Sequence, residues 1–387
     1  MPIRIRDVAK RAGVSTATVS HVLNGTRPTT EATRARVLAV ARELGYHPSA
    51  VARGLRTKST GTLGVVLSDI RNPFFTALVR GIEDVAQANG LNLIVCNSDE
   101  DEKKAETYLR LLLAKRVEGL VFTPTGRANA LLEPFLAMGI PVILIDRIAP
   151  GLTLPFVGVD NVRGAREAVA HLLEDGHRRI GVVAGLSNVS TSTDRLEGYR
   201  LALAGRGLAA DSALIRDGHS SVHGGEEAAR KLLALAQRPT ALFTTNNLMT
   251  LGALMACARL GLRCPDDVAL CGFDDHEWAE LFSPSLTVVR QPTYEIGTTA
   301  ARLLARAIHG EALPAEAVLL KTRLIIRASC RPGGHKEKLE EEAGEPEGPS
   351  MRHRPGHPRA TTTCDEKNSQ DGRRIAGDGD STHDDLY

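Results

Sequence analysis

The chain has 387 residues, of which 42% are hydrophobic and 24% are charged, so it is long enough for two or three domains with sizeable cores. The net charge of +2 conceals an uneven distribution, because residues 1–60 carry 11 Lys and Arg against three acidic residues. A basic head indicates a polyanionic partner such as nucleic acid, although a merely solvated basic face would give the same count.

The six cysteines form no CxxC pair and have no metal-ligand spacing with histidine, so they indicate small core residues in a reducing compartment. The sequence has no N-terminal apolar signal segment and no apolar run of membrane-spanning length. Motifs of a nucleophile elbow, a P-loop or a dinucleotide-binding loop are also absent from it. We therefore expect a cytoplasmic protein with no catalytic residues, no metal and no cofactor.

Residues 5–24, reading IRDVAKRAGVSTATVSHVLN, place apolar side chains at helical spacing on both sides of Gly13. The pattern predicts a short helix, a tight turn in which Gly13 takes a positive φ, and a second helix capped by Ser15. This is the layout of a helix-turn-helix, whose second helix enters the major groove of DNA, and an ordinary helical hairpin is the alternative. A third helix over 31–44 would complete a small DNA-binding head, residues 1–47.

Residues 48–61 are expected to form a hinge helix and linker. Pro48 can begin a short helix over Ser49–Leu55, which is marginal alone because it has fewer than about 12 residues. Such a helix needs a partner, either DNA or a second copy of itself, and a plain interdomain linker is the alternative.

From Thr62 to residue 330, short apolar runs alternate with helical stretches. Strands are expected over residues 63–67, 91–96, 119–122, 142–145, 156–159, 180–183, 241–244, 268–271, 286–290 and 318–326. Helices are expected over residues 75–89, 103–115, 164–175, 195–205, 226–236, 248–260 and 294–309. Continuous apolar strands indicate parallel sheets buried on both faces. About ten units of a strand and a helix are more than one ordinary open sheet holds. We therefore expect an α/β core, residues 62–330, of two doubly wound parallel-sheet subdomains with a ligand cleft at the strands' carboxyl ends.

Residues 331–387 are rich in Gly, Pro, Glu, Arg, His and Thr and contain few large apolar residues, so we expect a disordered tail. The tail lacks the apolar heptad run that would join dimers, which favours a dimer over a tetramer.

These stretches resemble the lactose-repressor (LacI/GalR) family of bacterial transcription regulators. The resemblance runs from about residue 5 to residue 327 and rests on IRDVAKRAGVSTATVSHVLN, LGYHPSAVARGLRT, GVVLSDIRNPFF, VGVDN, DRLEGYR, CGFDD and SPSLTVVRQP. The head is similar to those of purine and ribose repressors. The resemblance implies a homodimer that binds palindromic double-stranded operator DNA, and a core of the periplasmic-binding-protein type I that binds a small polar effector such as a sugar.

The resemblance also implies which residues of the head and hinge meet DNA. Thr16, Ala17 and His21 would face base edges, where Thr and Ala can touch a thymine methyl group and His can donate to guanine. The residues expected to contact phosphates or to cap the helix are Ser15, Thr18, Ser20 and Asn24. Leu55 matches the hinge-helix leucine that wedges into the minor groove and kinks the duplex, although Gly54 departs from the Ser or Gln often found before it.

Carried over in the same way, the residues of the effector cleft are Phe74, Phe75, Asn97, Asp146, Arg147, Asp160, Arg195, Asn246 and Asp274. Arg195 and Asp274 would supply donors and acceptors to a polyhydroxylated ligand, or would form an interdomain salt bridge. Of the two phenylalanines, one is expected to face the ligand and the other to pack in the core. Arg147 suggests a carboxylate or phosphate on the effector, or else is an exposed loop residue.

We therefore expect a ligand-controlled transcription factor, usually a repressor, of carbohydrate or related catabolic genes, and not an enzyme. A solute-binding or sensing protein is one alternative, against which the basic head argues. A regulator controlled mainly by a protein partner is another. Whether the effector acts as an inducer or as a corepressor stays open.

Overall fold

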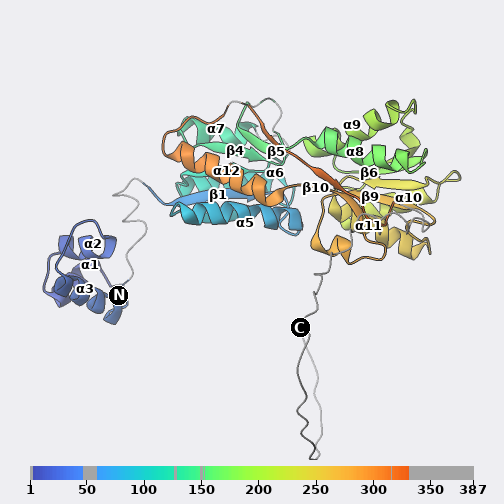
Figure 1. Ribbon diagram of the computed structural model, residues 1–387. Coiled ribbons are helices and arrows are strands. Elements are labelled where there is room, and N and C mark those ends of the chain that lie inside the picture. Colours follow the sequence, from blue (N-terminus) through green and yellow to red (C-terminus); the bar gives the residue numbers. More distant parts are fainter. Residues whose placement is uncertain are drawn as a thin grey trace, which may run out of the picture. The chain divides into compact units, whose positions relative to one another are not determined.

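The computed structural model describes residues 3–46, 59–125, 129–148, 151, 153–314 and 316–330 (Figure 1). The predicted hinge helix with Leu55, and the predicted disordered tail over 331–387, lie outside these residues. No helix in the described part of the chain is long and apolar enough to cross a membrane.

The head consists of three helices around one small core. They are α1 (Ile5–Ala12), α2 (Thr16–Asn24) and α3 (Glu31–Glu43). Each helix contributes a fully buried valine to the core, namely Val8, Val19 and Val37. Gly13 has a φ of 65°, and the hydroxyl of Ser15 caps α2, so the predicted turn and cap are both confirmed.

The first subdomain is a six-stranded sheet in the order β11-β5-β4-β3-β1-β2, with every neighbouring pair parallel. Its strands are β1 (Thr62–Leu67), β2 (Asn92–Asn97), β3 (Gly119–Phe122), β4 (Val142–Ile145), β5 (Phe156–Val159) and β11 (Val318–Leu320). Its helices are α5 (Pro73–Ala88), α6 (Glu102–Ala114), α7 (Asn129–Ala137) and α12 (Thr293–Ile308). Buried side chains of α5 and α12 form one core with the sheet, and those of α6 and α7 form another.

The second subdomain is a six-stranded sheet in the order β12-β10-β9-β8-β6-β7, parallel except for its edge strand β12. Its strands are β6 (Ile180–Ala184), β7 (Ile215–Asp217), β8 (Ala241–Thr244), β9 (Ala269–Phe273), β10 (Thr287–Arg290) and β12 (Arg323–Ile325). The helices α8 (Asn161–Glu174) and α9 (Ser190–Ala204) share one core with it, and α10 (Val222–Leu233) and α11 (Asn247–Arg259) share the other. Two short 3-10 helices are η1 (Ser212–Leu214) and η2 (Glu277–Glu280). The predicted class, two parallel-sheet α/β subdomains behind a helical head, is confirmed.

Within the described residues, the chain passes between the two subdomains three times. It crosses from β5 to α8, from β10 to α12, and from β11 to β12 (Figure 1). The prediction of one strand over 318–326 is therefore wrong, because β11 and β12 belong to different sheets. An apolar run shows that a segment is extended, but not that the chain changes sheets within it.

Glycine allows α5 and α12 to lie directly against each other (Figure 1). A Cβ at Gly297 of α12 would lie 2.1 Å from the carbonyl oxygen of Leu78, and a Cβ at Gly81 of α5 would lie 2.4 Å from that of Tyr294. These positions admit no side chain, so the two helices pack backbone against backbone.

Candidate functional site

A cavity of about 220 Å³ lies where the carboxyl ends of strands from both sheets meet. Residues that follow β1, β2 and β4 in the first sheet, and β6, β7, β8, β9 and β10 in the second, line it. Seven of the nine predicted cleft residues are in the lining: Phe74, Phe75, Asp146, Arg147, Arg195, Asn246 and Asp274. A cleft at this edge of doubly wound sheets is where such folds bind ligands.

The backbone around the cavity is held in an unusual conformation. The described non-glycine residues with positive φ include Asp99, Glu100, Asp146, His219, Ser220 and Asp274, and all six line the cavity. Left-handed backbone disfavours residues with a Cβ, so the surrounding structure must hold these side chains in place. The strain is concentrated where the strands end and the loops begin.

Arg195 is the most deeply buried arginine in the cavity lining, with 5% of its surface exposed. Its Nε donates to Asn161 Oδ1 at 2.8 Å, and one of its terminal nitrogens donates to the carbonyl of Thr245 at 2.6 Å. The guanidinium lies 3.7 Å from the centre of the Phe273 ring. Burial lowers the pKa of Arg195, whereas the carboxylates of Asp274 and Asp146 act to raise it.

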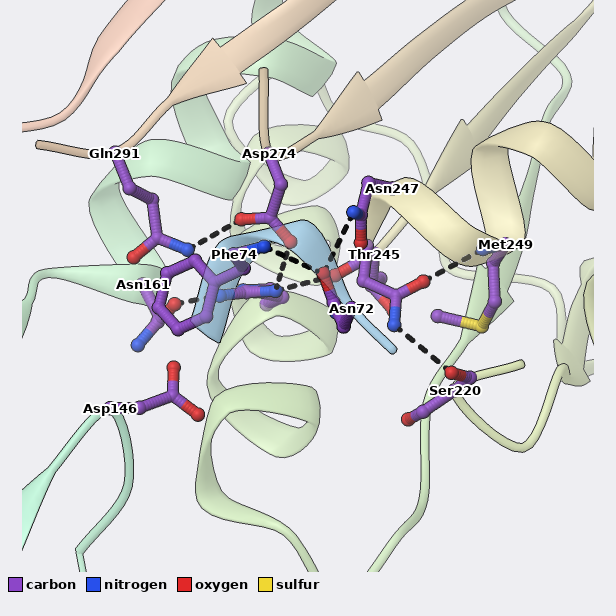
Figure 2. A network of polar contacts seen from close by, with 12 residues as sticks. Asn72, Phe74, Asp146, Asn161, Ser220, Thr245, Asn247, Met249, Asp274 and Gln291 are labelled. Carbon is purple, nitrogen blue, oxygen red and sulfur yellow. Dashed lines mark hydrogen bonds and ion pairs between the residues drawn. The ribbon is translucent and has the colours of Figure 1, made fainter. Parts of the chain in front are cut away.

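Arg195 and Asp274 lie 3.9 Å apart between the nearest nitrogen and oxygen, and both belong to the second subdomain. The alternative of an interdomain salt bridge is therefore wrong for this pair. The amide of Gln291 donates to the other oxygen of Asp274 at 2.5 Å, as Figure 2 shows. Asp274 thus keeps one oxygen near Arg195 and the other on Gln291.

Arg147 is almost completely committed to carboxylates of its own subdomain. Two of its nitrogens donate to the two oxygens of Glu100, each at 2.7 Å, and its Nε donates to Asp146 at 3.1 Å. Burial acts to lower the pKa of Arg147, but Glu100 and Asp146 outweigh burial and raise it. Arg147 is therefore not an exposed loop residue. Its charge is already neutralised within the protein.

Asp146 points into the cavity from the end of β4 (Figure 2). Burial raises its pKa, against the lowering effect of Arg147 and Arg195. This carboxylate can accept a hydrogen bond from a ligand hydroxyl while Arg147 holds it from behind.

A chain of side-chain hydrogen bonds links the two subdomains beside the cavity. Asn72 caps α5, and its Oδ1 accepts from Phe74 N at 3.0 Å and from Asn247 Nδ2 at 2.9 Å (Figure 2). Asn247 Nδ2 also donates to His276 Nε2 at 2.5 Å. Burial lowers the pKa of His276, which favours the neutral ring that this acceptor role requires.

Phe74 and Phe75 both line the cavity and both are 3% exposed. Their rings meet edge to face with centroids 5.0 Å apart. Asn246 has a double role, because its Oδ1 caps α11 by accepting from Met249 N while the residue also lines the cavity.

The structure does not place Asn97 or Asp160 in the lining of the cavity. Asn97 orders the neighbouring loops, because its side chain accepts a hydrogen bond from Ile70 N and donates one to the carboxylate of Asp99. Asp160 caps α8, accepting from Arg163 N at 2.9 Å. Asn97 is the last residue of β2 and Asp160 directly follows β5, so both lie where ligand residues do, and both order the backbone there.

Sequence reasoning missed several lining residues, chief among them Glu100, Thr245 and Gln291. Gln291 directly follows β10, as Thr245 directly follows β8. The position after each parallel strand was therefore the signal that could have found them.

The face of α2 opposite the buried Val19 and Val22 carries Thr16, Ala17, Ser20, His21 and Asn24. Thr16 and Ala17 are exposed, and His21 is half-buried. This face is the one available to a DNA groove.

Several polar residues at the start and on the face of α2 hydrogen-bond within the head. Ser15 Oγ accepts from Thr18 N at 3.0 Å, and the two hydroxyls are 2.9 Å apart. Asn24 Nδ2 donates back to the carbonyl of Ser20 at 2.6 Å. Ser15 is thus a cap, and Asn24 is folded onto its own helix.

The described residues contain no group of three or more His, Cys, Asp or Glu side chains that could hold a metal ion. A helix-turn-helix head followed by a two-subdomain core with a central polar cavity defines a DNA-binding regulator with an effector domain. Residues 4–49 match the bacterial regulatory proteins of the lacI family, and residues 169–330 match the periplasmic binding protein-like domain.

The chain is 36% identical over 329 residues to the HTH-type transcriptional repressor PurR of Photobacterium profundum, covering 84% of this chain and 98% of the relative. Among solved structures, it is similar to the lac repressor dimer bound to operator and the anti-inducer ONPF, with a TM-score of 0.76 and 28% identity over 86% of this chain and 100% of the other. It is also similar to a complex of the transcriptional regulator CelR with cellobiose, with a TM-score of 0.65 and 32% identity over 84% of this chain and 99% of the other.

The chain belongs to the LacI family of transcriptional regulators. It is a DNA-binding repressor with an effector-binding domain, and its family consists of regulators and not of enzymes.

Proposed function

We propose that this repressor binds an uncharged, polyhydroxylated effector of the sugar class in the cavity between its subdomains. The observation that carries the proposal is the arrangement of Asp146, Arg195 and Asp274 around the cavity, beside the rings of Phe74 and Phe75. Carboxylates accept from hydroxyl groups, the guanidinium donates to them, and aromatic faces cover the apolar C–H side of a sugar ring.

Charge argues for a neutral ligand. The lining contains five carboxylates and three guanidinium groups. Arg147 is paired with Glu100 and Asp146, and Arg71 is paired with Asp69 at 2.9 Å. A phosphate or carboxylate on the effector would therefore be repelled by the excess negative charge of the lining. For this reason we do not propose that Arg147 binds an anionic group of the effector. The similarity to the CelR complex with cellobiose supports the sugar class.

The regulation would be a shift between two arrangements of the subdomains. The cavity takes side chains from both subdomains, so a bound sugar favours whichever arrangement brings them together. The operator favours one arrangement too, and the two ligands are then coupled by the difference in their affinities for the two states. Thr16, Ala17 and His21 would read bases, and Leu55 would wedge into the minor groove.

We further propose that the repressor is a homodimer on a palindromic operator, because one recognition helix reads only a few base pairs. Large apolar side chains are exposed on the second subdomain, where Leu281 is 84% exposed and Phe282 follows it at 36%. Exposed apolar residues of this size indicate a surface that is covered in an assembly.

The test has two steps. Full-length protein is used to select duplexes from a randomised library, and an enriched inverted repeat is expected. Thermal unfolding is then followed with pentoses, hexoses, disaccharides, sugar acids and purines, with and without the selected duplex. A neutral sugar is expected to raise the melting temperature and to change operator affinity.

Three results would count against the proposal. Stabilisation by sugar acids or purines but not by neutral sugars overturns the ligand class. Sequence-specific binding with no response to any small molecule favours control by a protein partner. Retention of the whole function after deletion of residues 1–60 favours a solute-binding protein.

A further inference from the structure

His21 is tied to the loop that follows its own helix. Its ring Nδ1 lies 2.9 Å from the hydroxyl oxygen of Thr26. The backbone also joins these two residues, because Thr26 N donates to the carbonyl of His21 at 3.3 Å. Between them, Gly25 takes a φ of 63° and turns the chain back toward the helix. Thr26 thus contacts His21 at both the main chain and the ring.

The contact with Thr26 is compatible with two states of the His21 ring in which the other ring nitrogen, Nε2, is a hydrogen-bond donor. If the Thr26 hydroxyl donates to Nδ1, the neutral ring carries its proton on Nε2 and presents a donor there. If the ring is doubly protonated, Nδ1 donates to Thr26 and Nε2 is again a donor. Only the neutral ring with its proton on Nδ1 makes Nε2 an acceptor. Within residues 3–46, Thr26 is the one hydrogen-bond partner that the His21 ring has, so Nε2 is available to a ligand.

The surroundings of the pair suit nucleic acid. His21 and Thr26 line an open groove of about 320 Å³ together with Arg27 and Arg34. Neither arginine is in an ion pair within the described part of the head, where Arg11 pairs with Glu43. Two uncommitted cations beside the recognition helix attract the phosphate backbone of DNA.

We propose that Thr26 is a positioning residue, which orients the His21 ring so that Nε2–H donates to a guanine in the major groove. Guanine offers the acceptors N7 and O6 at that edge, whereas adenine replaces O6 by an amino group that donates. The inference rests on the proposed function, because it assumes that α2 enters the major groove. It adds a specificity determinant outside the helix to those within it.

The experiment uses full-length protein and the duplex selected from the randomised library. The base pair read by His21 is the one at which His21→Ala abolishes the selected preference. At that position guanine is replaced by 7-deazaguanine, which lacks N7, or by 2-aminopurine, which lacks O6. Thr26→Val removes the hydroxyl at nearly constant volume, and Thr26→Ser, which retains it, is the matched control.

The wild type and Thr26→Ser are expected to lose about three- to tenfold in affinity on one of the two analogues, as for one net hydrogen bond. Thr26→Val is expected to bind guanine about three- to tenfold more weakly than the wild type and to lose nothing further on that analogue. Unchanged melting temperatures of the variants exclude unfolding as the cause.

Three outcomes separate the inference from its premise. If Thr26→Val retains the full analogue penalty, the ring does not depend on Thr26 and the inference is overturned. If the preferred base at the His21 position is not guanine, the assignment of guanine as the acceptor is wrong and the inference is overturned, even though the repressor binds DNA. If the wild type enriches no sequence, the proposed function itself fails.

Discussion

Gln291 donates to Asp274 across 2.5 Å, and Gln291 lies in the segment that carries the chain from β10 to α12. A cavity carboxylate is therefore tied directly to one of the crossings between subdomains. A ligand that engages Asp274 alters the surroundings of that crossing without any intermediary.

Gln291→Met removes the donor at similar volume and is expected to lower the free energy of unfolding by about 1.5–3 kcal/mol, because a buried carboxylate loses a charge-assisted hydrogen bond. Urea denaturation measures this. The control is Gln237→Met, since Gln237 is exposed. Equal midpoints for the two variants would show that the Gln291 contact contributes nothing.

Arg195→Met is expected to lower stability by about 3–5 kcal/mol, because Asp274, Asn161 and the Thr245 carbonyl lose a shared buried partner. Neutral sugar should no longer raise its melting temperature. Arg163→Met is the matched control, as Arg163 is 59% exposed and paired with Glu167, and exposed pairs contribute about 0–1 kcal/mol. A variant that retained wild-type stability would contradict the central role given to Arg195.

Asp146→Asn should change how stability depends on pH. Burial raises the pKa of Asp146, so the folded protein retains this proton where the unfolded chain has lost it. The wild type should therefore lose stability relative to Asp146→Asn as the pH rises above about 4.

Asp267→Asn supplies a control of opposite sign. The backbone N–H of Arg263 lowers the pKa of Asp267, so the wild type should gain stability relative to this variant as the pH rises to about 4, above which the difference is constant. Denaturation midpoints measured from strongly acidic to neutral pH check both trends, since the two windows lie on opposite sides of about pH 4. Parallel trends would contradict the assigned environments.

Gly297→Ala is expected to destabilise the first subdomain by several kcal/mol, since its Cβ would overlap the carbonyl of Leu78 and force α5 and α12 apart. Gly205→Ala is the control, because the nearest atom there is 3.3 Å away and φ is −62°. Thermal unfolding compares them. Equal melting temperatures would mean that the helices separate at no cost.

Leu281→Asp with Phe282→Asp should convert the proposed dimer into monomers in sedimentation experiments, because two charges would be buried in an apolar interface. Met138→Asp is the control, since Met138 is 62% exposed on the first subdomain. If the double variant stays dimeric, the interface lies elsewhere.

Much of the fold was predictable because fully buried strands read as unbroken apolar runs. The strands at 119–122, 142–145, 156–159 and 241–244 have the predicted bounds. Elements were not predicted where a proline or a very short length hides the pattern of a helix or strand. The helix Asn129–Ala137 is not predicted because it has Pro134 inside it, and the strand Ile215–Asp217 is not predicted because it has only three residues.

The residues of the cavity could be predicted only in part, and for one physical reason. A polar residue after a parallel strand can cap the next helix, receive a ligand, or do both. Asp160 is a cap outside the cavity lining, Asn246 is a cap within it, and Asp146 is no cap at all. All three are short polar residues that follow a strand, and only the packed backbone distinguishes them.

The order of the strands also bears on how the protein is made. The first sheet receives its edge strand β11 and its covering helix α12 only after the whole second sheet apart from β12 has left the ribosome. During synthesis, the apolar face of the first sheet that α12 later covers is shielded from water only in part, by α5. A nascent chain halted just after β10 would therefore have an incomplete first subdomain. Its exposed apolar surface would make it a substrate for chaperones.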